Sequence, residues 1–126
     1  MSVVGLGTDI IEISRIEKMS AATKDKLARR VLTPEELVHH ANLNFPDRYL
    51  AKRWAGKEAA SKALGTGIAN GVSFQNFQIN SLASGQPVLI ISGKALVITE
   101  ELGAKSWHIS LSDEATYATA VVILSK

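Results

Sequence analysis

The chain has 126 residues, a formal net charge of +2, 46% hydrophobic residues and 21% charged residues. This length suits one domain over residues 1–126, and the composition is that of a folded globular protein rather than a disordered one. The absence of cysteine excludes disulfides, thiolate catalysis and cysteine-ligated metals.

The first residues favour a strand and then a helix. Residues 3–11 are rich in β-branched side chains and contain glycines, which favours a strand with Asp9 near its end. Ser14 and Glu17 have the spacing of a capping box, so a helix is predicted over 14–30.

Two further helices are predicted in the middle of the chain. A second capping box at 33–36, with proline at the first helical position, predicts a helix over 34–42. Pro46 begins another over 46–64, and Gly65 is well placed to end it. The buried stripe of that helix is predicted to contain Leu50, Trp54, Ala60, Ala63 and Leu64.

In the second half of the chain, strands are predicted over 74–79 and 87–91, a helix over 93–102, and two further strands over 107–112 and 117–124. A turn rich in serine and glycine, 81–86, joins the first two strands. Strict alternation after Trp107 places His108 and Ser110 on the face opposite Ile109. The whole pattern predicts an α+β domain, a small antiparallel sheet packed with helices.

Location and charge narrow the possible partners. The N-terminus lacks a basic leader, and the longest apolar run, 118–124, is too short to cross a bilayer, so we expect a cytoplasmic protein with no membrane partner.

Residues 15–30 carry six basic and two acidic side chains, and residues 47–62 carry five basic and two acidic side chains. Such segments attract anionic ligands or an acidic partner. Nucleic acid is not expected, because stacking aromatic residues are scarce there.

Two separated carboxylates are candidates for a magnesium and phosphate site. Glu58 and Lys62 are four residues apart and share a helix face, with Lys57 and Arg53 close by in sequence. Asp9 supplies the second carboxylate. Magnesium favours one or two carboxylates together with waters and phosphate oxygens, so two acidic ligands are enough.

Each of these residues also has an ordinary structural explanation. Asp9 would simply cap the segment that follows it, and Glu58 would pair with Lys62 on an exposed helix for roughly 0.2–0.5 kcal/mol. Lys57 would be a solvated surface lysine, and His108 would belong to a half-exposed strand. The local sequence alone leaves both interpretations open.

Three blocks of sequence occur in order along the chain: Gly5-Leu6-Gly7-Thr8-Asp9-Ile10-Ile11 through Arg15, then Trp54 with Lys57-Glu58-Ala59 and Lys62, and then Trp107-His108-Ile109-Ser110-Leu111-Ser112-Asp113. In these blocks, and over nearly its whole length, the chain resembles the holo-acyl-carrier-protein synthases, the small bacterial phosphopantetheinyl transferases. This resemblance implies transfer of 4′-phosphopantetheine from coenzyme A to a serine of apo-acyl carrier protein, in fatty acid biosynthesis. Adenosine 3′,5′-bisphosphate would be the leaving group.

The resemblance also implies roles for individual residues. Asp9 and Glu58 would hold magnesium and, with Lys62, form the catalytic group; the base is left open between Glu58 and a magnesium-activated water oriented by Asp9. The residues expected to bind coenzyme A are Arg53, Lys57, Lys62, Gly65, Pro87, His108 and Ser110. Arg15 is matched to the carrier-docking helix, whereas Lys18 and Lys24 are placed there by charge alone. Asp113 receives no role, because some relatives carry histidine there.

Single-unit members of this family are reported as homotrimers with active sites between subunits, which is the expected assembly for a chain of this length. Two rival functions remain open. A small thioester hydrolase or other metal-independent coenzyme A enzyme would work with magnesium chelated. A non-catalytic trimeric module would bind nucleotide or carrier without turnover.

Overall fold

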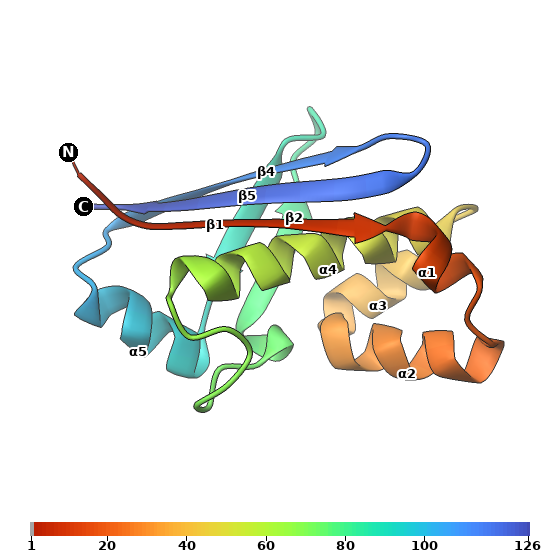
Figure 1. The fold of residues 1–126 in the computed structure, drawn as a ribbon, viewed down its shortest axis with the longest axis horizontal. Helices are drawn as coiled ribbons and strands as arrows, with labels where there is room; N and C mark the ends of the chain where they lie inside the picture. The colour runs from red at the N-terminus through yellow and green to blue at the C-terminus, as the bar shows by residue number, and fades with distance from the viewer. Residues whose placement is uncertain (1) are drawn as a thin grey trace.

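The computed structural model describes residues 2–126, which form two antiparallel sheets and five α-helices (Figure 1). The elements in chain order are β1 (Val3–Glu12), α1 (Ile13–Glu17), α2 (Ala21–Val31), α3 (Pro34–Ala41), α4 (Pro46–Ala63), the 3-10 turn η1 (Phe74–Asn76), β2 (Phe77–Ser81), β3 (Pro87–Ile91), α5 (Gly93–Glu101), β4 (Ser106–Asp113) and β5 (Tyr117–Ser125). Within residues 2–126, no helix combines the length and hydropathy of a membrane span.

The long helix α4 organises the molecule. It lies along one face of a three-stranded sheet with strand order β1-β5-β4, while β2 and β3 form a separate hairpin (Figure 1). Helices α1, α2 and α3 gather at one end of α4, and α5 lies at the other. On the opposite face of the three-stranded sheet, Leu6, Ile10, Tyr117 and Val121 are exposed.

Small residues bring α4 close to the sheet. The side of α4 that is buried against the rest of the chain includes Ala51, Ala55, Ala59, Ala60 and Ala63. A methyl group added at Gly7 of β1 would collide with the carbonyl oxygen of Ala59, and one at Gly5 with that of Ala63. These two glycines therefore set the short distance between β1 and α4, and with it the position of Asp9 over the helix.

Local sequence signals place most elements correctly. The predicted strands 3–11, 87–91, 107–112 and 117–124 and the helices 34–42, 46–64 and 93–102 are confirmed with boundaries within one residue. The capping box of α3 forms as expected: the Thr33 backbone N–H donates to Glu36 Oε1 at 2.8 Å, and the Glu36 N–H donates to Thr33 Oγ1 at 3.4 Å.

Two predicted elements were wrong in part. The helix predicted over 14–30 is two helices, because Ser20 accepts a hydrogen bond from the Thr23 backbone N–H at 3.2 Å and starts α2 anew. Ser14 does not cap α1; its hydroxyl donates to Glu12 at 2.7 Å. The strand predicted over 74–79 begins only at Phe77, after η1.

Candidate functional site

Asp9 and Glu58 line one cavity between β1, α1 and α4. The cavity has a volume of about 250 Å³, and its lining residues are Asp9, Ile10, Ile11, Arg15, Trp54 and Glu58. Asp9 pairs in register with the buried Ala120, so its side chain is on the α4 side of the sheet. The structure thus brings together two carboxylates that are 49 positions apart in the chain.

Lys62 belongs to the same group. Its Nζ lies 3.0 Å from Asp9 Oδ1 and donates to the Thr8 carbonyl oxygen at 3.1 Å. The Lys62 side chain is 52% exposed and the Asp9 side chain 18% exposed, so this ion pair faces water. A cation held at the rim beside two carboxylates remains available to an incoming anion.

The environment of Glu58 opposes its negative charge. Burial raises the pKa of the Glu58 carboxyl above its ordinary value, and the charge of Asp9 raises it further. The positive charge of Lys62 acts in the opposite direction without cancelling the increase. Two carboxylates that repel each other in a half-buried cavity have the chemistry of a site that a cation would stabilise.

This pair of carboxylates fits magnesium rather than a metal with a full protein ligand set. Within residues 2–126, no three His, Asp or Glu side chains gather in a way that could hold a metal ion. Magnesium needs only one or two carboxylates where a phosphate substrate and waters supply the other oxygens. Asp9 and Glu58 are hard oxygen donors on one cavity, so they fit that requirement.

Lys57 differs from the expectation for a phosphate-binding residue. Its side chain is fully buried, and its Nζ pairs with Glu36 Oε1 at 2.5 Å and donates to the Val31 carbonyl oxygen at 2.6 Å. Burial lowers the pKa of Lys57, and the Glu36 charge opposes that change. Lys57 therefore joins α2, α3 and α4 in the interior, although it is the residue next to Glu58.

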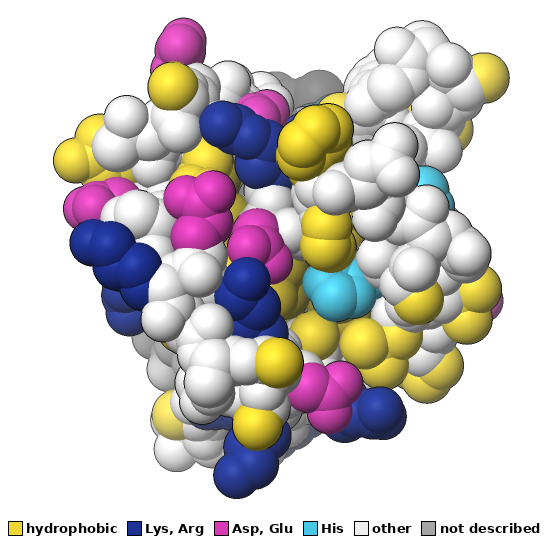
Figure 2. All heavy atoms as spheres, turned by 90° about the vertical axis from the view of Figure 1, so that its right-hand side faces the viewer, with side chains coloured by type: hydrophobic (Ala, Val, Ile, Leu, Met, Phe, Trp, Pro, Cys, Tyr) yellow, Lys and Arg dark blue, Asp and Glu magenta, His cyan; other side chains and the backbone are white. Residues whose placement is uncertain are grey.

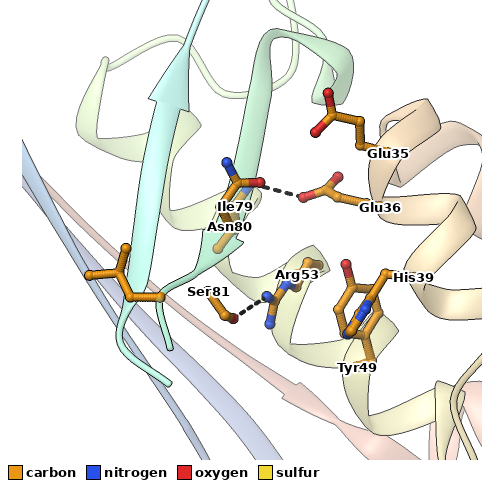
Figure 3. A pocket seen from close by; sticks show the side chains of 9 residues that line it. Glu35, Glu36, His39, Tyr49, Arg53, Ile79, Asn80 and Ser81 are labelled. Carbon is orange, nitrogen blue, oxygen red and sulfur yellow. Dashed lines mark hydrogen bonds between the residues drawn. The ribbon is translucent and has the colours of Figure 1, made fainter. Parts of the chain in front are cut away.

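Arg53 lines a different, larger cavity of about 490 Å³ among α3, α4 and β2 (Figure 3). Its guanidinium lies 4.4 Å from the centre of the Tyr49 ring, and its Nη2 donates to Ser81 Oγ at 3.0 Å. Arg53 Nε is buried and has no hydrogen-bond partner in the structure. An incompletely paired buried guanidinium is a plain candidate for contact with an anion.

The other residues expected to contact coenzyme A are divided between two places. Pro87 and His108 line one cavity of about 120 Å³ where β3 meets β4, and Ser110 is exposed on the same face of β4 as His108. Gly65 is exposed at the end of α4 with φ of +81°. Neither place shares a lining residue with the cavity of Asp9 and Glu58.

The three expected docking cations have different surroundings. Arg15 is exposed, with its guanidinium carbon 5.4 Å from the centre of the Trp54 ring. Lys18 is exposed at the end of α1, whereas Lys24 pairs with Asp47 at 2.8 Å. Figure 2 shows the end of the molecule that carries α1–α3, where basic and acidic side chains are interleaved rather than separated. The predicted cationic surface is therefore broken up by carboxylates.

Sequence reasoning missed two contacts near these sites. Trp54 was predicted to lie in the buried stripe of α4, yet it is only half-buried and lines the cavity of Asp9 and Glu58. Its position one helical turn before Glu58 could have indicated that the two side chains share a face. Asp113 binds Arg48 at 3.1 Å and Lys52 at 3.3 Å, which ties the β4–β5 turn to α4. No sequence spacing indicated the Asp113 contacts, because they join residues more than 60 positions apart.

Comparison with known proteins gives a consistent result along the whole chain. Residues 5–122 match the sequence model of the 4′-phosphopantetheinyl transferase superfamily. A holo-[acyl-carrier-protein] synthase of Photobacterium profundum is 53% identical over 124 residues, which is 98% of each chain.

Solved structures agree with the sequence comparison. The holo-[acyl-carrier-protein] synthase of Neisseria meningitidis superposes with a TM-score of 0.88 and 41% identity, covering 99% of this chain and 100% of that one. The enzyme of Bacillus anthracis, solved in complex with CoA (3′,5′-ADP), gives a TM-score of 0.81 and 37% identity over 97% and 96% of the two chains. The predicted α+β fold is thereby confirmed.

Proposed function

We propose, because this chain belongs to the 4′-phosphopantetheinyl transferase superfamily and within it to the holo-[acyl-carrier-protein] synthases, that it transfers 4′-phosphopantetheine from coenzyme A to a serine of apo-acyl carrier protein. The products are holo-acyl carrier protein and adenosine 3′,5′-bisphosphate. The observation that carries the proposal is the cavity in which Asp9 and Glu58 lie together with Lys62 at its rim. Residues 1–126 act in this proposal as one unit.

The residues of the cavity divide the work of phosphoryl transfer. Asp9 and Glu58 hold Mg²⁺, which when bound neutralises the pyrophosphate of coenzyme A. The serine oxygen of the carrier forms a bond to the phosphorus of phosphopantetheine, and the bond from that phosphorus to the bridging oxygen breaks. Lys62 stabilises the negative charge that remains on the departing bisphosphate.

The serine proton needs an acceptor at the same cavity. Glu58 is the candidate within this chain, because its carboxylate lines the cavity where the serine must react. A water oriented by Asp9 is the alternative. In both cases the proton ends on a group at the cavity while the bisphosphate leaves.

Coenzyme A contacts are proposed for Gly65, Lys62 and four further residues outside the Asp9 cavity. Arg53, with its unpaired Nε, suits a phosphate, and Pro87 with His108 forms a small cavity beside the exposed Ser110. Lys57 is not included, because its ammonium group is buried against Glu36.

The separation of these residues supports a homotrimer with the site between subunits. The sheet face away from α4 carries four exposed apolar side chains, which the β1–β5 register places on that one face: Leu6, Ile10, Tyr117 and Val121. His108 and Ser110 lie on that same face through their pairing with β5. Packing of this face against other copies would bury it and bring His108 and Ser110 to a neighbouring Asp9 cavity.

Substitution of Val121 tests this assembly. Val121→Asp places a charge on the exposed apolar face, so it should yield monomers and lose transfer activity, because the sites are then incomplete. Size-exclusion chromatography with light scattering measures the mass, and the Lys126→Asp variant at the chain end is the charge control. A wild-type monomer with full activity would contradict the assembly.

The carrier is proposed to dock near α1 and α2. Arg15 and Lys18 are exposed there and would meet acidic side chains of the carrier. Lys24 would contribute only after exchanging its partner Asp47. A cytoplasmic location stays a prediction from the sequence.

The experiment that tests the function is the intact mass of an apo-acyl carrier protein incubated with this protein and coenzyme A, with magnesium or with a chelator. A mass gain of one phosphopantetheine only with magnesium supports both the reaction and the metal. A gain in both samples contradicts the role of Asp9 and Glu58 as magnesium ligands. No gain with a folded carrier favours a binding module, and release of acyl groups from acyl-coenzyme A instead would favour a thioester hydrolase.

A further inference from the structure

An indole group joins the β2–β3 hairpin to the three-stranded sheet. In the described chain, β3 and β4 belong to separate sheets, so strand pairing does not set the distance between them. Trp107 Nε1 of β4 donates to the carbonyl oxygen of Leu89 in β3 at 2.9 Å. Both residues line the cavity of about 120 Å³ that also contains Pro87 and His108. The hydrogen bond therefore crosses from β4 to β3 at the cavity itself.

The two bonded residues are sequence neighbours of two residues proposed to contact coenzyme A. Leu89 follows Pro87 by two positions in β3, and Trp107 immediately precedes His108 in β4. A movement of β3 relative to β4 would change the spacing between Pro87 and His108. The Trp107 hydrogen bond opposes such a movement.

The hairpin is held at its two edges by different groups. At the β2 edge, the Ile79 backbone N–H donates to the buried Glu36 carboxylate at 2.8 Å, which joins the hairpin to α3. At the β3 edge, the Leu89 carbonyl accepts from Trp107, which joins the hairpin to β4. Loss of the second bond would release β3 from β4 while the anchor of β2 remains.

We propose that Trp107 is a positioning residue for coenzyme A, because its indole N–H holds β3 beside β4 and thereby sets the spacing of Pro87 and His108. This inference rests on the proposed function, which gives those two residues their contacts with coenzyme A. The indole N–H only donates, and that of a half-buried tryptophan needs a fixed acceptor. Loss of one neutral hydrogen bond corresponds to about a two- to ten-fold change in an equilibrium constant.

Substitution of Trp107 separates this role from a purely structural one. Trp107→Phe removes the N–H and keeps an aromatic ring, so it should raise the KM for coenzyme A by about two- to ten-fold. The kcat and the KM for apo-carrier protein should stay nearly unchanged, because the lost contact affects only the binding of coenzyme A.

The matched control is Ser106→Ala in the same strand. It removes the hydrogen bond of 2.7 Å between Ser106 Oγ and Ser125 Oγ, which joins β4 to β5 rather than to β3. The KM for coenzyme A should not change in this variant. An equal increase in Ser106→Ala and Trp107→Phe would mean general loosening of β4, and that result, or no increase in Trp107→Phe, would overturn the inference.

A double-mutant cycle tests the link to His108. The increase in KM caused by Trp107→Phe should shrink in the His108→Ala background, because the spacing to an absent side chain no longer affects binding. The matched background is Ser110→Ala, in which the increase should persist, since Ser110 is not among the residues that line this cavity. Fully additive effects of Trp107→Phe and His108→Ala would overturn the inference.

Magnetic resonance gives a readout that requires no substitution of Trp107, which keeps the test valid if Trp107→Phe fails to fold. The chain has two tryptophans, so the spectrum of Trp54→Phe identifies the indole N–H resonance of Trp107 in the wild-type protein. Saturation with coenzyme A should shift this resonance, because the ligand would enter the cavity that Trp107 lines. A resonance that does not move would overturn the inference.

Calorimetric titration with coenzyme A separates failure of the inference from failure of the proposed function. The Kd for coenzyme A should rise in Trp107→Phe by the same factor as the KM, whereas Ser106→Ala should bind like the wild type. Equal Kd values in Trp107→Phe and in a wild type that transfers phosphopantetheine would overturn the inference alone. Wild-type binding without transfer would refute the proposed function alone, and absence of both would refute the two together.

Discussion

Two lysines on α4, five residues apart, make ion pairs of opposite character. Lys57 is fully buried against Glu36, whose carboxylate also accepts from the backbone N–H groups of Thr33 and Ile79, each at 2.8 Å. Lys62 is half-exposed, with Asp9 as its carboxylate partner. The first pair is buried in the interior, whereas the second faces water beside the cavity that Asp9 lines.

The difference shows that neighbouring charged residues of α4 have different tasks: Lys57 stabilises the interior, whereas Glu58 and Lys62 belong to the proposed site. Successive helix positions are about 100° apart, so Lys57 and Glu58 face different directions, whereas Glu58 and Lys62 share a face. Lys57 ties α4 to the end of α2 and the start of α3, and Glu58 thereby keeps a fixed place relative to β1. The buried pair supports the open one.

Removal of the open carboxylates should have the largest effect. Asp9→Ala and Glu58→Gln should each abolish transfer. The rate should fall by at least roughly 100-fold, because the loss of even an outer-shell partner of a metal can cost that much activity. The intact-mass assay with excess magnesium measures the rate, and circular dichroism verifies the fold. The exposed Glu101→Gln in α5 is the matched control and should be fully active. Full activity in either cavity variant would refute the metal assignment.

Disruption of the closed pair should unfold rather than inactivate the protein. Lys57→Met leaves the Glu36 carboxylate buried without a counter-charge and should cost about 3–5 kcal/mol in the free energy of unfolding. Urea denaturation at fixed protein concentration measures it. The double variant Lys57→Met with Glu36→Gln removes the unpaired charge, and it should recover most of the loss. A stable but inactive Lys57→Met would show that Lys57 has a direct part in catalysis.

Lys62→Met should have the opposite profile. The pair with Asp9 is solvent-exposed, so its loss should change the free energy of unfolding by at most about 1 kcal/mol. The rate of transfer should nevertheless fall about 100-fold, because a cation beside the leaving phosphate is absent. The same denaturation and mass assays test both values. A change in stability as large as that of Lys57→Met would mean that the two pairs are equivalent.

Element boundaries could be predicted wherever a local signal fixes them. The capping box at Thr33, the proline at 46 and the left-handed Gly65 each act within one turn of chain, and each boundary agreed with the structure. The break between α1 and α2 was missed because Ser14 and Ser20 both have the chemistry of a helix cap, and only Ser20 is used.

The direction of the α4 side chains could not be obtained from the sequence in the same way. Helix spacing shows that Lys57 and Glu58 point apart, but α4 is buried on most of its sides, so hydrophobic periodicity does not tell which direction is the interior. The partner that buries Lys57 is Glu36, 21 positions away on α3. The Asp9–Glu58 pairing was accessible only through the family resemblance.

The smallest expected effect concerns the pH dependence of stability without metal. Burial and the charge of Asp9 raise the pKa of Glu58, so the folded protein binds this proton more tightly than the unfolded chain does. The resulting stabilisation is complete below the unfolded pKa, about 4.3, and is lost as pH rises through the higher folded pKa. The amide of Glu58→Gln does not ionise and avoids this loss.

The thermal midpoint of Glu58→Gln should therefore match that of the wild type near pH 4 and exceed it at pH 7, by a small margin because the side chain is half-exposed. Calorimetry in chelator measures both midpoints. In an Asp9→Asn background the margin should shrink, because one cause of the raised pKa is gone. A lower midpoint for Glu58→Gln at pH 7 would mean that the ionised carboxylate stabilises the fold through Lys62, and the open pair would then be structural like the closed one.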